Sequence, residues 1–114
     1  MGANTQFLTE LNPEYLQHYS QLAAILAKPS APDAVTKELI ILAVAINQRC
    51  ETCIAVHVDQ YIKAGGNYEQ LSDLDNIAIL MDGDPGMAFA GKVLDCFDRF
   101  LKYIKKPEAF ALAF

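Results

Sequence analysis

Residues 38–57 read ELIILAVAINQRCETCIAVH, and this stretch decides the fold that we expect. It opens with an apolar run, Leu39 to Ile46, that is hydrophobic on every side of a helix, so we expect a central helix surrounded by others. The β-branched residues of this run would also suit a strand, but its length and its Ala and Leu content favour a helix. A polar break at residues 47–49 precedes a second helical segment that begins at or near Cys50.

The segments on either side of this stretch also show helical spacing. Apolar residues recur every three or four positions, and Pro, Gly, Asn and Asp stand where helices start or stop. No sustained alternation predicts a strand, so the sequence predicts an all-α fold, one compact domain of five or six helices over residues 1–114. We expect a lead-in at residues 1–11 and helices from Asn12-Pro13 to Lys28, over about 34–47, from Cys50 to about Ala64, from Asn67 to Gly83, from Asp84-Pro85 to Pro107, and a short one at 108–114.

The composition limits the classes of partner and compartment. A hydrophobic content of 53% is high for a soluble monomer and indicates apolar surface that another subunit covers. The net charge of −5 argues against a nucleic acid and against an anionic membrane surface as partners. The first residues lack the pattern of a signal peptide, and no apolar run is long enough to span a bilayer. We therefore expect a cytoplasmic protein.

Four reactive side chains interrupt the apolar stretch: Glu38, Cys50, Cys53 and His57. The two cysteines are three positions apart at the start of a helix, so their sulfurs can reach each other, and the helix dipole together with Arg49 would favour a thiolate there. Cys53 and His57 lie on one helical face, where the imidazole can take a proton from the thiol. Glu38 reaches His57 only if the two helices pack antiparallel, and would then orient the ring.

Of three other interpretations of the cysteines, a zinc site and a pair of inert core cysteines stay open at this point, and haem attachment fails. Cys and His are ligands that zinc prefers, but a structural site needs four, and Glu38 is the only candidate for the fourth because Cys96 lies in a different helix. Haem attachment would require a histidine directly after Cys53, where Ile54 stands. A pair of inert core cysteines is the third interpretation, since free Cys is often buried.

The spacing E-x11-C-x2-C-x3-H, formed by Glu38, Cys50, Cys53 and His57, resembles the signature of the AhpD-like alkylhydroperoxidase family within the carboxymuconolactone decarboxylase superfamily. The flanking sequences TKELI, LAVA and AG agree with it, and the resemblance is firm over residues 33–66. Members of the superfamily that act as decarboxylases typically lack the cysteine pair. The pair therefore favours the peroxidase-like branch.

The resemblance implies a thiol peroxidase or disulfide oxidoreductase, an antioxidant enzyme that needs no metal or flavin cofactor. Cys53 would attack the peroxide, Cys50 would close a redox-active disulfide, and Glu38 and His57 would relay protons. A dithiol donor, a lipoyl-protein or a thioredoxin-like protein, would reduce the disulfide. Members of the family are commonly trimers or hexamers. Some active members carry a second histidine between the cysteines, where this chain has Thr52, which implies a weaker proton relay.

Two alternative functions accompany this one. The first is a carboxymuconolactone decarboxylase-like acid–base enzyme that uses Glu38 and His57, and the second is a non-enzymatic protein that is a zinc-bound or oligomeric scaffold. Outside the stretch, His18 is expected at the surface and Cys96 in the core or at a subunit interface. Tyr61, four positions after His57, is expected to wall the site.

Overall fold

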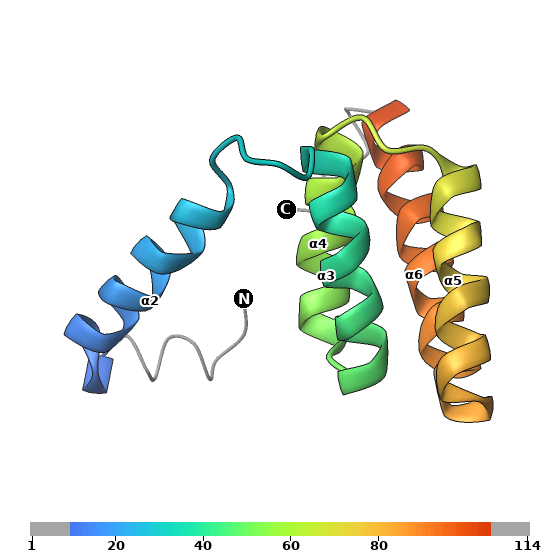
Figure 1. Ribbon diagram of the computed structural model, residues 1–114, viewed down its shortest axis with the longest axis horizontal. Coiled ribbons are helices and arrows are strands. Elements are labelled where there is room, and N and C mark those ends of the chain that lie inside the picture. The colour runs from blue at the N-terminus through green and yellow to red at the C-terminus, as the bar shows by residue number, and fades with distance from the viewer. Residues whose placement is uncertain (1–9, 106–114) are drawn as a thin grey trace. The chain divides into compact units, whose positions relative to one another are not determined.

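The computed structural model describes residues 10–105, which form helices joined by short connections (Figure 1). This part of the chain contains no strand, so the predicted all-α class is confirmed. Residues 10 and 11 are helical where the sequence predicted a lead-in. The remainder of the predicted lead-in and the tail helix at 108–114 lie outside the described residues. The helices are α2 (Pro13–Leu26), α3 (Ala34–Gln48), α4 (Glu51–Lys63), α5 (Tyr68–Asp82) and α6 (Asp84–Lys105).

By their contacts the helices fall into two units, residues 1–34 and 35–114. Helix α2 belongs to the first unit, and it starts as predicted, with Asn12 at the N-cap and Pro13 in the first turn. The Asn12 side chain makes no capping hydrogen bond, so the fixed φ of the proline is the main local signal for this start. None of the residues of α2 is buried.

The second unit contains α3 to α6, packed around one apolar core (Figure 1). Helix α6 packs against both α4 and α5. Each helix contributes a stripe of buried residues at three- and four-residue spacing, as an amphipathic helix on a core should. The largest fully buried side chains are Tyr61, Leu42, Ile46, Leu71, Val58 and Val93.

Helix α3 differs from the expectation that it is surrounded on every side. Leu42, Ala45 and Ile46 face the core, but Ile40 and Val44 are 55% and 49% exposed. An all-apolar helix sequence predicts that every face of the helix is covered. It does not predict whether the same chain or another subunit covers each face. The prediction of a central, fully surrounded helix is therefore wrong for this chain taken alone.

A glycine pair makes the turn from α4 to α5. Gly65 has a φ of +91°, which favours glycine, and Asn67 caps α5 by accepting from the N–H of Gln70 at 2.8 Å. Both features were predicted. Tyr61 is fully buried instead of lining the site; its ring packs near Phe97 of α6, and its hydroxyl donates to the carbonyl of Asn67 at 2.6 Å.

One carboxyl group lies inside the core. Asp75 of α5 is 3% exposed, and neither of its oxygens has a hydrogen-bond partner among the described residues. Burial without a partner disfavours the charged form and raises the pKa of Asp75 to about 7. The core therefore holds a group that changes its charge near neutral pH.

Within residues 10–105, no helix combines the length and the apolar character that crossing a bilayer would require.

Candidate functional site

The site is built on the turn between α3 and α4. The N–H of Arg49 donates to the carbonyl of Ile46 at 3.2 Å, and the N–H of Cys50 donates to that of Ala45 at 3.1 Å. These two bonds define a Schellman motif, in which the residue after the helix adopts a left-handed conformation. Arg49 takes that place with a φ of +55°. The turn sends α4 back beside α3 (Figure 1).

Cys50 is at once the end of this turn and the N-cap of α4. Its Sγ accepts the N–H of Cys53 at 3.2 Å, the position that Ser or Asp oxygens usually occupy in a capped helix. A disulfide joins Cys50 to Cys53, with 5.2 Å between the two Cα atoms. The sequence prediction that the two sulfurs can reach each other is confirmed. The hydroxyl of Thr52 lies 3.9 Å from the Sγ of Cys50.

A carboxylate and an imidazole meet across α3 and α4. The Oε2 of Glu38 lies 2.7 Å from the Nδ1 of His57, and the two side chains are 17% and 30% exposed. An ionised carboxylate only accepts hydrogen bonds, so the Nδ1 must carry the proton. The lone pair of the neutral ring is then on Nε2, which leaves that atom able to accept a proton. The helices thus have the antiparallel arrangement that a Glu38–His57 contact required.

The imidazole makes no hydrogen bond to either cysteine sulfur in the described part of the chain. This fits the oxidised state of the pair, because disulfide sulfurs have no proton to donate. The i, i+4 relation of Cys53 and His57 on α4 keeps both on one helical face. In the reduced state a thiol on that face would have a proton to give.

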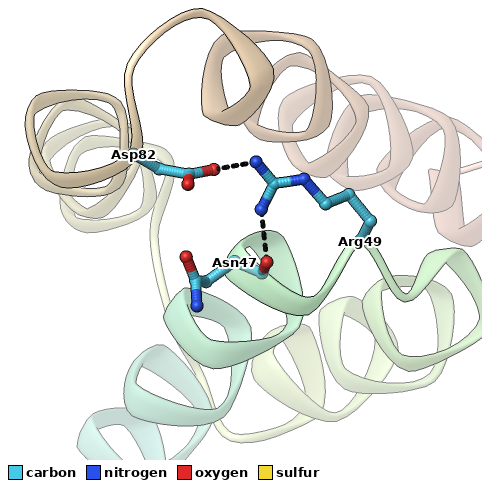
Figure 2. Close-up of polar contacts among 3 residues, drawn as sticks. All are labelled: Asn47, Arg49 and Asp82. Carbon is cyan, nitrogen blue, oxygen red and sulfur yellow. Dashed lines mark hydrogen bonds and ion pairs between the residues drawn. The ribbon is translucent and has the colours of Figure 1, made fainter.

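Two ion pairs tie the start of α4 to later helices. Glu51 of the first turn pairs with Lys92 of α6 at 2.9 Å. Arg49 pairs with Asp82, the last residue of α5, at 2.7 Å (Figure 2). The sequence suggested that Arg49 adds positive potential near the thiols. The structure shows that its charge is engaged by Asp82, a partner that sequence reasoning did not foresee.

The remaining candidates lie elsewhere. Cys96 of α6 borders a hollow of about 140 Å³ with Glu51, Ile54, Ala55 and Lys92, and burial, with Asp95 next to it, raises the pKa of its thiol. His18 is exposed on α2, as predicted, 3.9 Å from Glu14. Between residues 10 and 105, no three His, Cys, Asp or Glu side chains gather as a metal site would require, so the zinc interpretation has no ligand set there.

Geometry and fold together define an α-helical protein with a CxxC disulfide at a helix start and a carboxylate–imidazole pair that joins this helix to the preceding one. Comparison with known proteins agrees with this class. Residues 13–95 match the model of the Carboxymuconolactone decarboxylase family, and the chain belongs to that family.

The chain is also similar to proteins from three other organisms. An uncharacterized protein of Cupriavidus necator is 31% identical over 97 residues, 83% of this chain and 86% of that protein. An uncharacterized protein of Haemophilus influenzae is 48% identical over 48 residues, 42% of each chain. The crystal structure of an apo carboxymuconolactone decarboxylase family protein from Legionella pneumophila superposes with a TM-score of 0.78 at 31% identity, covering 85% of this chain and 87% of that one.

Proposed function

We propose that the protein is a thiol-dependent peroxidase and disulfide oxidoreductase that reduces peroxides through Cys50 and Cys53. The observation that carries the proposal is the disulfide at the N-cap of α4, on the helix whose His57 is held by Glu38 at 2.7 Å. A redox-capable sulfur pair and an oriented proton acceptor thus share one helix. Family membership supports the fold, and the cysteine pair supports a redox reaction.

The reaction begins with reduced cysteines. The thiolate of Cys53 attacks the outer oxygen of a peroxide, the O–O bond breaks, and the products are the sulfenic acid of Cys53 and an alcohol that takes up one proton. Cys50 then attacks the sulfenic sulfur, and hydroxide leaves and is protonated to water. A dithiol donor reduces the Cys50–Cys53 disulfide by exchange and is itself oxidised. The two electrons that reduce the peroxide therefore come from the donor.

His57 and Glu38 move the protons in these steps. The Nε2 of His57 accepts the thiol proton, directly or through one water, and returns it to the leaving oxygen. Glu38 keeps the proton on Nδ1 and stabilises the imidazolium that forms in between. The first-turn amides of α4 stabilise the thiolates of both cysteines, which sit at the positive end of the helix dipole.

Thr52 stands between the cysteines and offers a hydroxyl 3.9 Å from the Sγ of Cys50. A hydroxyl is a weak donor to a thiolate and, unlike an imidazole, neither gains nor loses a proton near neutral pH. The proton relay of this chain is therefore restricted to His57 and Glu38.

The partners and the assembly are part of the same proposal. The electron donor is a dithiol, a lipoyl-protein or a thioredoxin-like protein, in the cytoplasm, and the enzyme acts on neither nucleic acid nor membranes. The exposed apolar side chains of α3, Ile40 and Val44, support a homo-oligomer, a trimer or hexamer, in which another subunit covers them.

Peroxide consumption with a dithiol donor tests the proposal. We expect the wild type and Cys96→Ser to be active, Cys53→Ser to be inactive, and His57→Ala to be slowed about 10²- to 10⁴-fold, the usual contribution of a general base. A thiol titration before and after peroxide should show the loss of two thiols in the wild type and none in Cys53→Ser. Equal rates in all four proteins would refute the proposal.

The family match favours one second candidate, an acid–base enzyme that uses Glu38 and His57 on a lactone-like acid. That activity would survive Cys→Ser substitution at both positions 50 and 53. The peroxidase would not, so one double variant separates the two functions.

A further inference from the structure

Arg49 occupies a backbone position that usually belongs to glycine. It is the one non-glycine residue with a positive φ in the described part of the chain. The left-handed conformation brings the Cβ of any L-residue too close to the following carbonyl, and helices that end in this motif therefore favour glycine there. A residue kept in a strained conformation next to a reactive cysteine suggests that its side chain does what glycine cannot.

The guanidinium of Arg49 links two helix ends (Figure 2). Nη1 donates to the carbonyl of Asn47, in the last turn of α3, where carbonyl groups have no partner within the helix. Nη2 lies 2.7 Å from the Oδ2 of Asp82 at the end of α5. The planar fork of arginine can meet both groups at once, which lysine cannot do in the same way.

The structure around Asp82 also favours this contact. A carboxylate in the last turn of a helix is placed unfavourably in the helix dipole unless a cation meets it. Gly86 of α6 leaves the room that the carboxylate occupies, since a Cβ at Gly86 would lie 2.8 Å from the Cβ and 3.0 Å from the Oδ2 of Asp82. Arg49, Asp82 and Gly86 thus form one arrangement, called here the Arg49 clamp.

We infer that Arg49 is a positioning residue for the Cys50–Cys53 couple, acting by holding the turn between α3 and α4 against the end of α5. Cys50 directly follows Arg49, and its N–H, its carbonyl and its sulfur all belong to the turn: the N–H bonds Ala45, the carbonyl accepts from Ile54 and the sulfur caps α4. A turn fixed at Arg49 keeps the sulfur of Cys50 near that of Cys53 in the reduced protein.

This inference rests on the proposed function, in which these two sulfurs react. It predicts the direction in which the reduction potential of the disulfide changes when the clamp is lost. Without the clamp the reduced turn gains freedom, so closing the disulfide loses more entropy and the disulfide becomes easier to reduce. We expect the equilibrium constant for disulfide formation to fall roughly two- to fivefold, as for the loss of one partly exposed charged contact. That change raises the reduction potential by about 10–20 mV at 29.6 mV per tenfold.

The experiment equilibrates full-length proteins, all carrying Cys96→Ser, with oxidised and reduced dithiothreitol or lipoate, and counts free thiols by alkylation. The variants are Arg49→Gly, Arg49→Lys and Asp82→Asn, with Asp95→Asn as the matched control, because Asp95 also pairs with an arginine, Arg99, at 3.0 Å on the exposed face of α6. Melting curves of each variant establish that it is folded.

The clamp predicts that Arg49→Gly and Asp82→Asn raise the reduction potential equally, and that a double variant carrying both changes shows no larger shift than either alone. Arg49→Lys should recover part of the shift. Asp95→Asn should leave it unchanged. Two outcomes would overturn the inference: folded Arg49→Gly with the wild-type potential, or opposite shifts in Arg49→Gly and Asp82→Asn, which would mean that the charge of Arg49 alone acts on the sulfurs.

The same preparations separate this inference from the proposed function. A wild type that forms the disulfide reversibly but consumes no peroxide refutes the peroxidase and leaves the clamp standing if the variants shift. A wild type that consumes peroxide while no variant shifts its potential refutes the clamp alone. A disulfide that does not form in the wild type refutes both.

Discussion

The two turns at either end of α4 use the same backbone device with different residues. At its C-terminal end, the N–H of Gly65 donates to Ile62 and that of Gly66 to Tyr61, both at 3.0 Å, which is again a Schellman motif. At its N-terminal end, Arg49 and Cys50 make the equivalent bonds. The turn at Gly65 and Gly66, the glycine turn, has the residues that the backbone prefers. The turn at Arg49 and Cys50, the Arg49 turn, has an arginine at the left-handed position and a cysteine as the N-cap.

The turn after α4 follows local backbone preferences, whereas the turn before α4 departs from them. Local rules favour Gly at the left-handed position and Asn at the N-cap, and the turn at Gly65 and Asn67 follows both. The turn at Arg49 and Cys50 follows neither, while it carries one sulfur of the disulfide and an ion pair to α5. Departures from local preference concentrate where function requires particular side chains. The following predictions change one turn at a time.

The largest effect is expected at the glycine turn. A Cβ at Gly66 would lie 2.2 Å from two ring atoms of Tyr61, a fully buried side chain whose hydroxyl is also fixed. Gly66→Ala should therefore lower the free energy of unfolding by about 3 kcal/mol or more, the upper range for overpacking. Urea unfolding measures it, with Gly91→Ala as the control because a Cβ there meets nothing within 4 Å. A wild-type midpoint for Gly66→Ala would contradict this packing.

Helix α5 runs from the glycine turn to Asp82 of the Arg49 clamp, and the buried Asp75 lies between these two ends. The pKa of Asp75 is raised from 3.8 to about 7 by burial. The folded protein then binds more protons than the unfolded chain between these values, and stability falls as the pH rises through them. From pH 5 to pH 8 we expect a loss of roughly 2–3 kcal/mol from this group.

Urea unfolding at pH 5, 6.5 and 8 measures this pH dependence. Asp75→Asn, which is neutral throughout, should remove the loss, and Asp73→Asn on an exposed face of the same helix should not. Equal slopes against pH in wild type and Asp75→Asn would show that another group is responsible.

Local signals in the sequence were sufficient for the helices but not for the contacts between them. Pro13, Asn67, Gly65 and Gly83 gave the helix limits to within one or two residues, because caps and stops act through neighbouring backbone atoms. The exposure of Ile40 was missed, since an apolar residue does not reveal which chain covers it.

The candidate site shows the same limit. Cys50 and Cys53 could be paired from their spacing, because both lie within one helical turn. The contact of Glu38 with His57 depended on how α3 and α4 pack against each other. Asp82 is thirty-three positions from Arg49, so only the packing of the helices reveals that ion pair. The burial of Asp75 did leave a signal: it falls on the face of Leu71, Leu74 and Ala78, although an aspartate is usually taken as exposed.

A smaller effect should follow from a Cβ at Gly65, the other glycine of the turn that follows α4. Gly65 has a φ of +91° and open space around it, so Gly65→Ala has no clash and only backbone strain. We expect a loss of about 1–2 kcal/mol in the free energy of unfolding, the cost of a left-handed conformation for a residue with a Cβ. The same urea experiment measures it, and a loss as large as that of Gly66→Ala would mean that strain and not the Tyr61 ring limits this turn.

The smallest effect on stability is expected from Arg49→Gly, which places a glycine at the left-handed position of the turn before α4. It relieves a strain of about 1–2 kcal/mol and removes a partly exposed ion pair that contributes about 0–1 kcal/mol. The two changes nearly cancel, whereas Arg49→Ala keeps the strain and loses the pair, so Arg49→Ala should be the less stable of the two by about 1 kcal/mol. Urea unfolding of both, in the disulfide form, measures the difference. If Arg49→Gly lost more than Arg49→Ala, position 49 would carry no left-handed strain, and the contrast between a turn built for stability and a turn built for the cysteine would fail.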